Sequence, residues 1–246
     1  MLNRVNEDAL GLLVGNEEYS GTYSPRNYTG RDLLLMETYL NNALGYPVDQ
    51  IYRLTNINNR QPVDSVLALI RQKTTSNSDI FVYLSGYGMV REEDDTYNPQ
   101  LVLNSEGQAN SLVNLIDLYR ALAALPSEKM VIINNIDFSR SFLHLSKNSN
   151  LPLQAFRQSL YNTAITLSSE HEGLAFMFSS ELDQANHLYL GNGNQDKKHH
   201  IFPYFLAKGL QQRHTTSGDL FQYLQRNVSY TARKLHNEPE DPGALR

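Results

Sequence analysis

Residues 80–90 read IFVYLSGYGMV, and this stretch decides the predicted fold. An unbroken apolar run favours a strand that is buried on both faces, and the glycine-rich turn SGYG at 85–88 follows it. A small-Gly-X-Gly turn at a strand end usually presents X at the edge of the sheet. We therefore predict a strand over 79–85 with Tyr87 at the sheet edge, where a functional side chain would lie.

Short apolar runs alternate with longer amphipathic segments on both sides of this stretch. They predict further strands at 9–15, 50–54, 129–136 and 173–180, and helices within 30–47, 62–74, 114–125, 201–212 and 217–235. Strands that are apolar on both faces and separated by helices indicate an α/β fold, with a mostly parallel central sheet and helices on both faces. Three segments, 16–29, 86–111 and 137–170, do not show this alternation of strand and helix patterns, and each follows a strand end. We therefore expect the functional cleft among them.

Composition narrows the class of protein. The 246-residue chain is 41% hydrophobic, which is enough for a substantial core. Its net charge of −5 and its scattered basic residues argue against a dedicated surface for nucleic acid or anionic membranes. No apolar run approaches the roughly 20 residues of a membrane span, and the first residues lack the pattern of a secretion signal, so we expect a cytoplasmic protein. The chain has no cysteine, which excludes disulfides, thiolate metal sites and cysteine nucleophiles.

Short motifs follow the predicted strand ends in order along the chain. They are GLLVGNEEY (11–19), GRD (30–32), SGYG (85–88), NIDFSR (135–140), FMFSSELDQA (176–185) and FPYFLAKGL (202–210). Together they resemble the caspase–hemoglobinase fold, in the metacaspase, paracaspase and bacterial caspase-like (peptidase C14-like) branch, from residue 9 to about residue 235. The resemblance implies one caspase-like sandwich domain, 1–246, with a large-subunit-like part at 1–150 and a small-subunit-like part at 165–246.

Two positions depart from the family pattern. The family's general-base histidine and its nucleophilic cysteine match Tyr87 and Asp137 of this chain. A phenol with an ordinary pKa of about 10 is a hydrogen-bond donor rather than a base at neutral pH, and an ionised carboxylate is a poor nucleophile toward an amide. We therefore predict that the chain is not an active peptidase. We also predict that the Tyr87 phenol donates a hydrogen bond to Asp137, directly or through one water.

The resemblance implies a better preserved binding site. In the metacaspase-like branch, an acidic pocket for an Arg or Lys side chain uses residues that match Asp32, Ser85 and Asn135, although Asn135 stands where the family has an aspartate. Asp137 could restore the missing charge from two residues away. The candidate binding residues are Asp32, Ser85, Gly86, Gly88, Asn135 and Ser179, and the candidate ligand is a basic peptide or a protein partner.

Two classes of function remain. The first is a pseudo-caspase that acts as a scaffold or regulator by binding a protein, such as an active caspase-like relative or a signalling assembly. The alternative is a hydrolase with altered chemistry in the same cleft, which would use Asp137 or a nearby serine, Ser139 or Ser141. We expect no cofactor and no metal. The acidic run at 92–95 lacks the ligand spacing of a calcium loop, and the histidine pair at 199–200 is expected on the surface.

Overall fold

The computed structural model describes residues 5–21, 23–93, 96–104, 109–141, 153–190, 197–212 and 216–245. Within these residues an eight-stranded sheet runs in the order β2-β1-β3-β6-β7-β8, with β4 paired to β3 and β5 paired to β4. The strands are β1 (Leu10–Gly15), β2 (Ile51–Thr55), β3 (Asp79–Glu93), β4 (Thr96–Val102), β5 (Leu112–Asn114), β6 (Lys129–Asp137), β7 (Leu174–Phe178) and β8 (Gly243–Leu245). Strands β2, β1, β3, β6 and β7 pair in parallel, and the other pairs are antiparallel. The predicted mostly parallel central sheet is confirmed.

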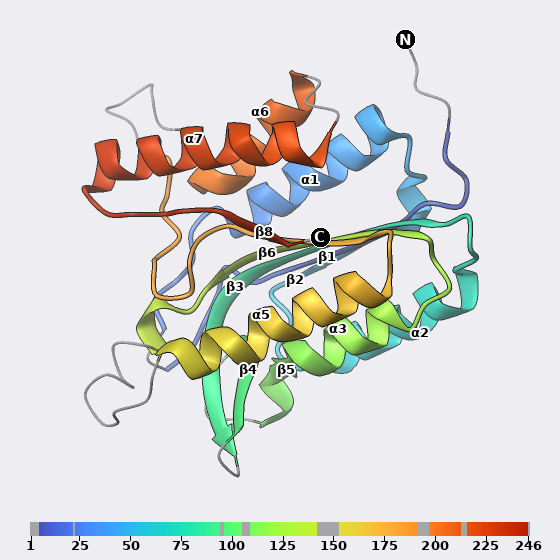
Figure 1. Cartoon of the computed structure of the whole chain (residues 1–246), viewed down its shortest axis with the longest axis horizontal. Coiled ribbons are helices and arrows are strands. Elements are labelled where there is room, and N and C mark those ends of the chain that lie inside the picture. The colour runs from blue at the N-terminus through green and yellow to red at the C-terminus, as the bar shows by residue number, and fades with distance from the viewer. Residues whose placement is uncertain are drawn as a thin grey trace.

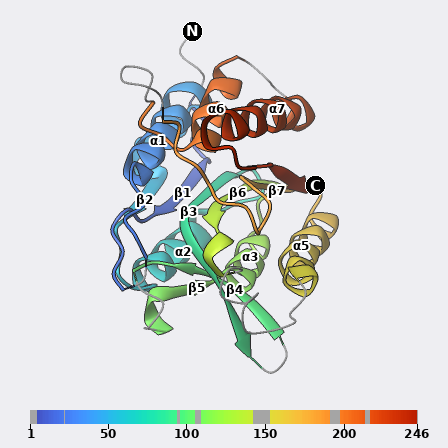
Figure 2. The ribbon, with the colours of Figure 1, turned by 90° about the vertical axis from the view of Figure 1, so that its left-hand side faces the viewer.

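Helices cover both faces of this sheet, as predicted. They are α1 (Thr29–Leu44), α2 (Gln61–Lys73), α3 (Leu115–Ala123), α5 (Leu153–Glu170), α6 (Ile201–Gln211) and α7 (Ser217–His236), with short 3₁₀ turns at Val48–Gln50 and Ala109–Ser111. Helices α1, α6 and α7 lie on one face, and α2, α3 and α5 lie on the other (Figure 1, Figure 2). No helix of the described residues is long and apolar enough to cross a bilayer.

Strand β3 shows how the sequence builds two cores. Ile80, Val82 and Leu84 pack into the core beneath α2, α3 and α5, whereas Phe81 and Tyr83 pack into the core beneath α1, α6 and α7. Alternate side chains of a strand point to opposite faces, so a run that is apolar throughout is buried on both sides. The carboxyl ends of the parallel strands consequently meet at one end of the sheet.

Two segments that we predicted as irregular are regular in part. Strand β3 continues past residue 85 to Glu93 and pairs antiparallel with β4, and the segment 137–170 contains α5. The buried residues of α5 include Phe156, Leu160 and Ala164, which recur every four positions between polar residues. A hairpin with a polar tip and a helix with one narrow apolar stripe give weak periodic signals in a single sequence.

Candidate functional site

The candidate residues lie where β3 and β6 pair, at the carboxyl end of the sheet. In the register of these parallel strands, Ser85 lies opposite Asn135, and Tyr87 lies opposite Asp137. The side chains of Ser85, Asn135 and Asp137 are buried, whereas Tyr87 is half-buried. The sheet therefore brings together four of the residues that the sequence singled out.

The Asp137 carboxylate is held by its own loop and by the segment that follows β7. Its Oδ1 accepts hydrogen bonds from the backbone N–H of Ser139 at 2.9 Å and from the Ser139 hydroxyl at 2.6 Å, and its Oδ2 accepts one from the N–H of Asn186 at 3.2 Å. Both Tyr87 and Asp137 belong to the described residues, and no direct hydrogen bond joins the phenol to the carboxylate. The direct form of the predicted hydrogen bond is wrong, and donors from Ser139 and Asn186 bond the two carboxylate oxygens instead.

The Tyr87 ring packs against two other tyrosines. It stacks on Tyr23 with ring centroids 4.9 Å apart, and Tyr19 meets it edge-on at 4.9 Å. The Tyr19 hydroxyl also accepts a hydrogen bond of 3.3 Å from the backbone N–H of Tyr87. Burial raises the pKa of the Tyr87 phenol, the Asp137 charge adds to this effect, and the Arg26 charge opposes it. The phenol is therefore protonated at neutral pH and cannot serve as a base.

Asn135 satisfies its amide within the protein. Its Nδ2 donates hydrogen bonds to the Tyr83 hydroxyl at 3.0 Å and to the Ser85 hydroxyl at 3.1 Å. Its Oδ1 accepts a hydrogen bond of 3.1 Å from Nδ2 of Asn186. Two of the three positions that the resemblance assigns to a ligand pocket, Ser85 and Asn135, are thus bonded to each other, and Asn135 is also bonded to Asn186.

Asn186 is inserted among the candidate residues. Its Oδ1 accepts hydrogen bonds from the hydroxyls of Ser179 at 3.1 Å and Ser180 at 2.7 Å, while its Nδ2 bonds Asn135. Asn186 is 8% exposed, and its backbone N–H bonds Asp137. One residue therefore engages the nucleophile position and two of the predicted binding residues at once.

Asp32 lies in the first turn of α1 and is 0% exposed. Nδ1 of His199 lies 2.7 Å from its Oδ1, and Nδ1 of His200 lies 2.5 Å from its Oδ2. Burial alone would raise the pKa of Asp32, but the interactions with His200 and then His199 outweigh burial and lower it. The predicted acidic group is therefore present and ionised, and it is already paired within the chain.

The expected surface position of the histidine pair is wrong for His200, which is 2% exposed. His200 precedes the first turn of α6, and its backbone N–H also donates to Asp32 at 3.3 Å. Burial and the nearby Arg26 charge lower the pKa of His200, so a neutral ring donates its Nδ1 proton to Asp32. The sequence separation of 168 residues between the partners explains why this contact was missed.

Arg26 is a buried cation in the same region. It is 4% exposed, its Nη2 donates to the backbone carbonyl of Asn135 at 3.2 Å, and its guanidinium carbon lies 5.9 Å from the Tyr87 ring centroid. Among the described residues its Nε has no hydrogen-bond partner and no carboxylate forms an ion pair with it. A buried guanidinium with an unused donor favours an anionic ligand.

The two glycines of the SGYG motif, which lies within β3, allow close packing and do not present a free surface. A Cβ on Gly86 would lie 2.6 Å from the Tyr19 hydroxyl, and a Cβ on Gly88 would overlap the ring of Phe138. Within the described residues no cluster of three or more His, Asp or Glu side chains is arranged to hold a metal ion. Asp94 and Asp95 of the acidic run lie outside those residues.

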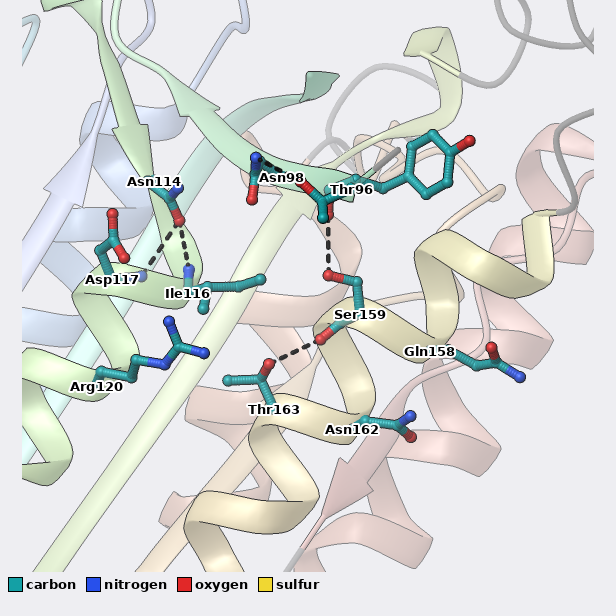
Figure 3. A pocket seen from close by; sticks show the side chains of 11 residues that line it. Thr96, Asn98, Asn114, Ile116, Asp117, Arg120, Gln158, Ser159, Asn162 and Thr163 are labelled. Carbon is teal, nitrogen blue, oxygen red and sulfur yellow. Dashed lines mark hydrogen bonds between the residues drawn. The ribbon is translucent and has the colours of Figure 1, made fainter. Parts of the chain in front are cut away.

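A groove lies away from these residues, between β4, α3 and α5 (Figure 3). This groove has a volume of about 530 Å³ and a mostly polar lining that includes Asn98, Arg120 and Asn162. Ser159 of α5 donates a hydrogen bond to the backbone carbonyl of Tyr97 at 2.9 Å, which ties the helix to β4. None of the predicted site residues lines this groove.

Sequence reasoning missed Arg26, Asn186 and the two histidines. Arg26 and Asn186 lie in or beside irregular segments, where a single arginine or asparagine carries no periodic signal. The segment 16–29 was expected to contribute to the functional cleft, and Arg26 of this segment contacts the backbone of Asn135. The sequence feature that could have indicated Arg26 is its position in a loop that follows a buried strand.

Comparison with known proteins identifies the family. The family model described as the caspase domain (Peptidase C14) matches residues 9–240, and no curated protein sequence matches the chain. Among solved structures, caspase-1 from Spodoptera frugiperda aligns with a TM-score of 0.60 and 13% identity over 99% of this chain and 90% of that chain. Protein GSU0716 from Geobacter sulfurreducens aligns with a TM-score of 0.58 and 12% identity over 97% of this chain and 93% of that chain. The fold is therefore caspase-like, and the chain belongs to the caspase domain (Peptidase C14) family.

Proposed function

We propose that this chain is a proteolytically inactive caspase-like protein that acts as a scaffold or regulator by binding a protein or peptide. The facing positions of Tyr87 and Asp137 carry the proposal. A protonated phenol cannot take up the proton of a nucleophile, and an ionised carboxylate opposes the negative charge that develops on a peptide carbonyl. The hydrogen bonds from Ser139 and Asn186 to Asp137 also support a structural role for that carboxylate.

The charges of the candidate site favour an acidic group on the partner over the basic group that the resemblance implies. Asp32 is already paired with His199 and His200, so it offers little to an incoming cation. Arg26 is unpaired among the described residues and retains an unused N–H. We therefore propose that the partner presents an Asp or Glu side chain, or a carboxyl terminus, to Arg26.

Peptide titration tests this proposal. Two labelled peptides of equal length, one centred on Asp and one on Arg, are titrated by fluorescence anisotropy into wild-type protein, Arg26→Met and Arg120→Met. Arg120 lies on the exposed side of α3 and serves as the charge-matched control. The expected result is binding of the acidic peptide that Arg26→Met abolishes and Arg120→Met preserves. Stronger binding of the basic peptide, lost in Asp32→Asn, would restore the basic-ligand expectation.

The alternative function, hydrolysis with altered chemistry, has one supporting observation. The Ser139 hydroxyl donates a hydrogen bond of 2.6 Å to Asp137, so a serine lies directly beside a carboxylate. An activated ester substrate would reveal weak activity of this pair more readily than a peptide. Hydrolysis that disappears in both Ser139→Ala and Asp137→Asn would favour this alternative.

A further inference from the structure

Residues 186–190 begin at Asn186 beside the candidate site, and residues 197–200 lead into α6. We call residues 186–190 and 197–200 the strap. Its two halves pair through a bridge between Leu188 and His200 and through a hydrogen bond of 2.8 Å from the N–H of Tyr189 to the carbonyl of His199. Because Asn186 lies at one end and the histidine pair at the other, movement of the strap would change access to Asn135.

The returning half of the strap is fastened to α1. His199 and His200 each place Nδ1 within 2.7 Å of an oxygen of Asp32. Protonation of an imidazole strengthens such a contact as long as the carboxylate stays ionised. This half therefore stays fastened when the pH falls from neutral to mildly acidic values.

The outgoing half is fastened by a different kind of contact. The His187 ring stacks on the His236 ring of α7 with centroids 4.6 Å apart and planes inclined by 16°. His236 Nε2 also lies 2.7 Å from the carbonyl oxygen of Leu188, to which it donates. Two stacked imidazoles attract each other when at least one is neutral, and they repel each other when both are protonated.

We propose that the strap is a pH-operated cover of the candidate site, released in acid at the stacked His187–His236 contact while its His200 side stays fastened to Asp32. Release withdraws Asn186 from Asn135, Ser179 and Ser180. The effect of this release on ligand access rests on the proposed function, whereas the release itself does not.

The charged groups around the His187–His236 pair have opposing effects on the pKa of His187. The Glu238 carboxylate lies 3.5 Å from Nε2 of His187 and raises the pKa of that ring. The Asp137 charge also raises it. Glu240 accepts the backbone N–H of His187 at 2.9 Å, and burial raises the pKa of its carboxyl well above the ordinary value, so it adds little negative charge. Burial and then His236 outweigh the acidic groups and lower the pKa of His187. The contact consequently contributes stability above the ordinary histidine pKa and loses it as the pH falls below that value.

Hydrogen exchange followed by mass spectrometry tests the release without any ligand or activity. Exchange of peptides covering 185–190 and 199–205 is measured at about pH 7.5 and about pH 5.5, either side of the ordinary histidine pKa of about 6.5, and corrected for intrinsic rates. The expected result is a clear loss of protection at 185–190 in acid, with protection of 199–205 unchanged, because acid weakens the stacked His187–His236 contact and leaves the Asp32 contacts in place.

Substitution of the stacked ring distinguishes this mechanism from general acid loosening. His236→Phe keeps an aromatic ring on His187 but removes the second charge and the hydrogen bond to the Leu188 carbonyl. Protection of 185–190 should therefore be lower at both pH values, and its response to acid should disappear. His171→Phe changes an exposed histidine and should respond as the wild type does. His187→Phe tests the same pair from the other side if His236→Phe does not fold.

Equal protection of 185–190 at the two pH values, equal loosening of 199–205, or an unchanged response in both ring variants would overturn the proposal. Failure of the acidic peptide to bind at either pH would instead count against the proposed function.

Discussion

Asn186 donates a hydrogen bond from its Nδ2 to Oδ1 of Asn135 at 3.1 Å, and both side chains are buried. A residue from a loop thereby fills the space beside the position of the family's nucleophile. The side chains of Asn135, Asn186 and Asp137 make hydrogen bonds within the chain, which is the condition for burying them at low energetic cost.

The first prediction concerns this inserted side chain. Asn186→Ala should lower the free energy of unfolding by about 2–3 kcal/mol, because it leaves Asn135 and the hydroxyls of Ser179 and Ser180 with unmet hydrogen bonds. Urea denaturation followed by circular dichroism measures the change. Asn162→Ala, on the exposed side of α5, is the matched control and should change stability by less than about 0.5 kcal/mol. Equal effects of the two substitutions would show that the hydrogen bonds of Asn186 do not stabilise the fold.

The second prediction separates the Tyr87 hydroxyl from its ring. Tyr87→Phe should change the free energy of unfolding by less than about 0.5 kcal/mol, since no hydrogen bond ties the phenol to Asp137. Tyr87→Ala should cost about 2–3 kcal/mol through lost packing against Tyr19 and Tyr23. Similar losses in both variants would indicate that the hydroxyl has a strong partner after all.

The third prediction follows from the lowered pKa of Asp32. Its ionised form stabilises the fold above the unfolded-state pKa of about 3.9, and this contribution is lost as the pH falls through the lower folded-state pKa. Asp32→Asn should therefore be less stable than wild type at neutral pH and should lose less stability on acidification below about pH 4. Urea midpoints across this range measure the difference. The exposed control Asp49→Asn should follow the wild-type curve, and a wild-type slope in Asp32→Asn would refute the role assigned to the histidine pair.

The fourth prediction is that Arg26 contributes to binding rather than to stability. Arg26→Met removes a buried charge with one hydrogen bond, so the free energy of unfolding should fall by no more than about 1 kcal/mol or should rise. Binding of the acidic peptide should be lost in the same variant. A large loss of stability would instead identify Arg26 as a structural cation.

The sequence predicted the elements that carry strong periodic signals and missed contacts made across long sequence distances. The apolar run of β3 was predicted correctly from local pattern, but the predicted strand end was wrong, because β3 continues through Ser85 and Tyr87 to Glu93. The partners of Asp32 lie 167 and 168 residues away, and no local rule pairs them. The direct Tyr87–Asp137 bond failed for a related reason. Facing backbone positions do not determine which side-chain donors reach a carboxylate, and Ser139 lies only two residues from Asp137.

Turnover of peptide reporters tests the central claim most directly. Fluorogenic peptides ending in Arg, Lys or Asp are incubated with wild-type protein, with Asp137→Ala and with the restored Tyr87→His, Asp137→Cys variant, each with and without calcium. The account predicts that wild-type protein releases fluorophore no faster than Asp137→Ala does, and any turnover by the restored variant would show that the cleft geometry survives. Clear wild-type turnover that Asp137→Ala abolishes would contradict the account.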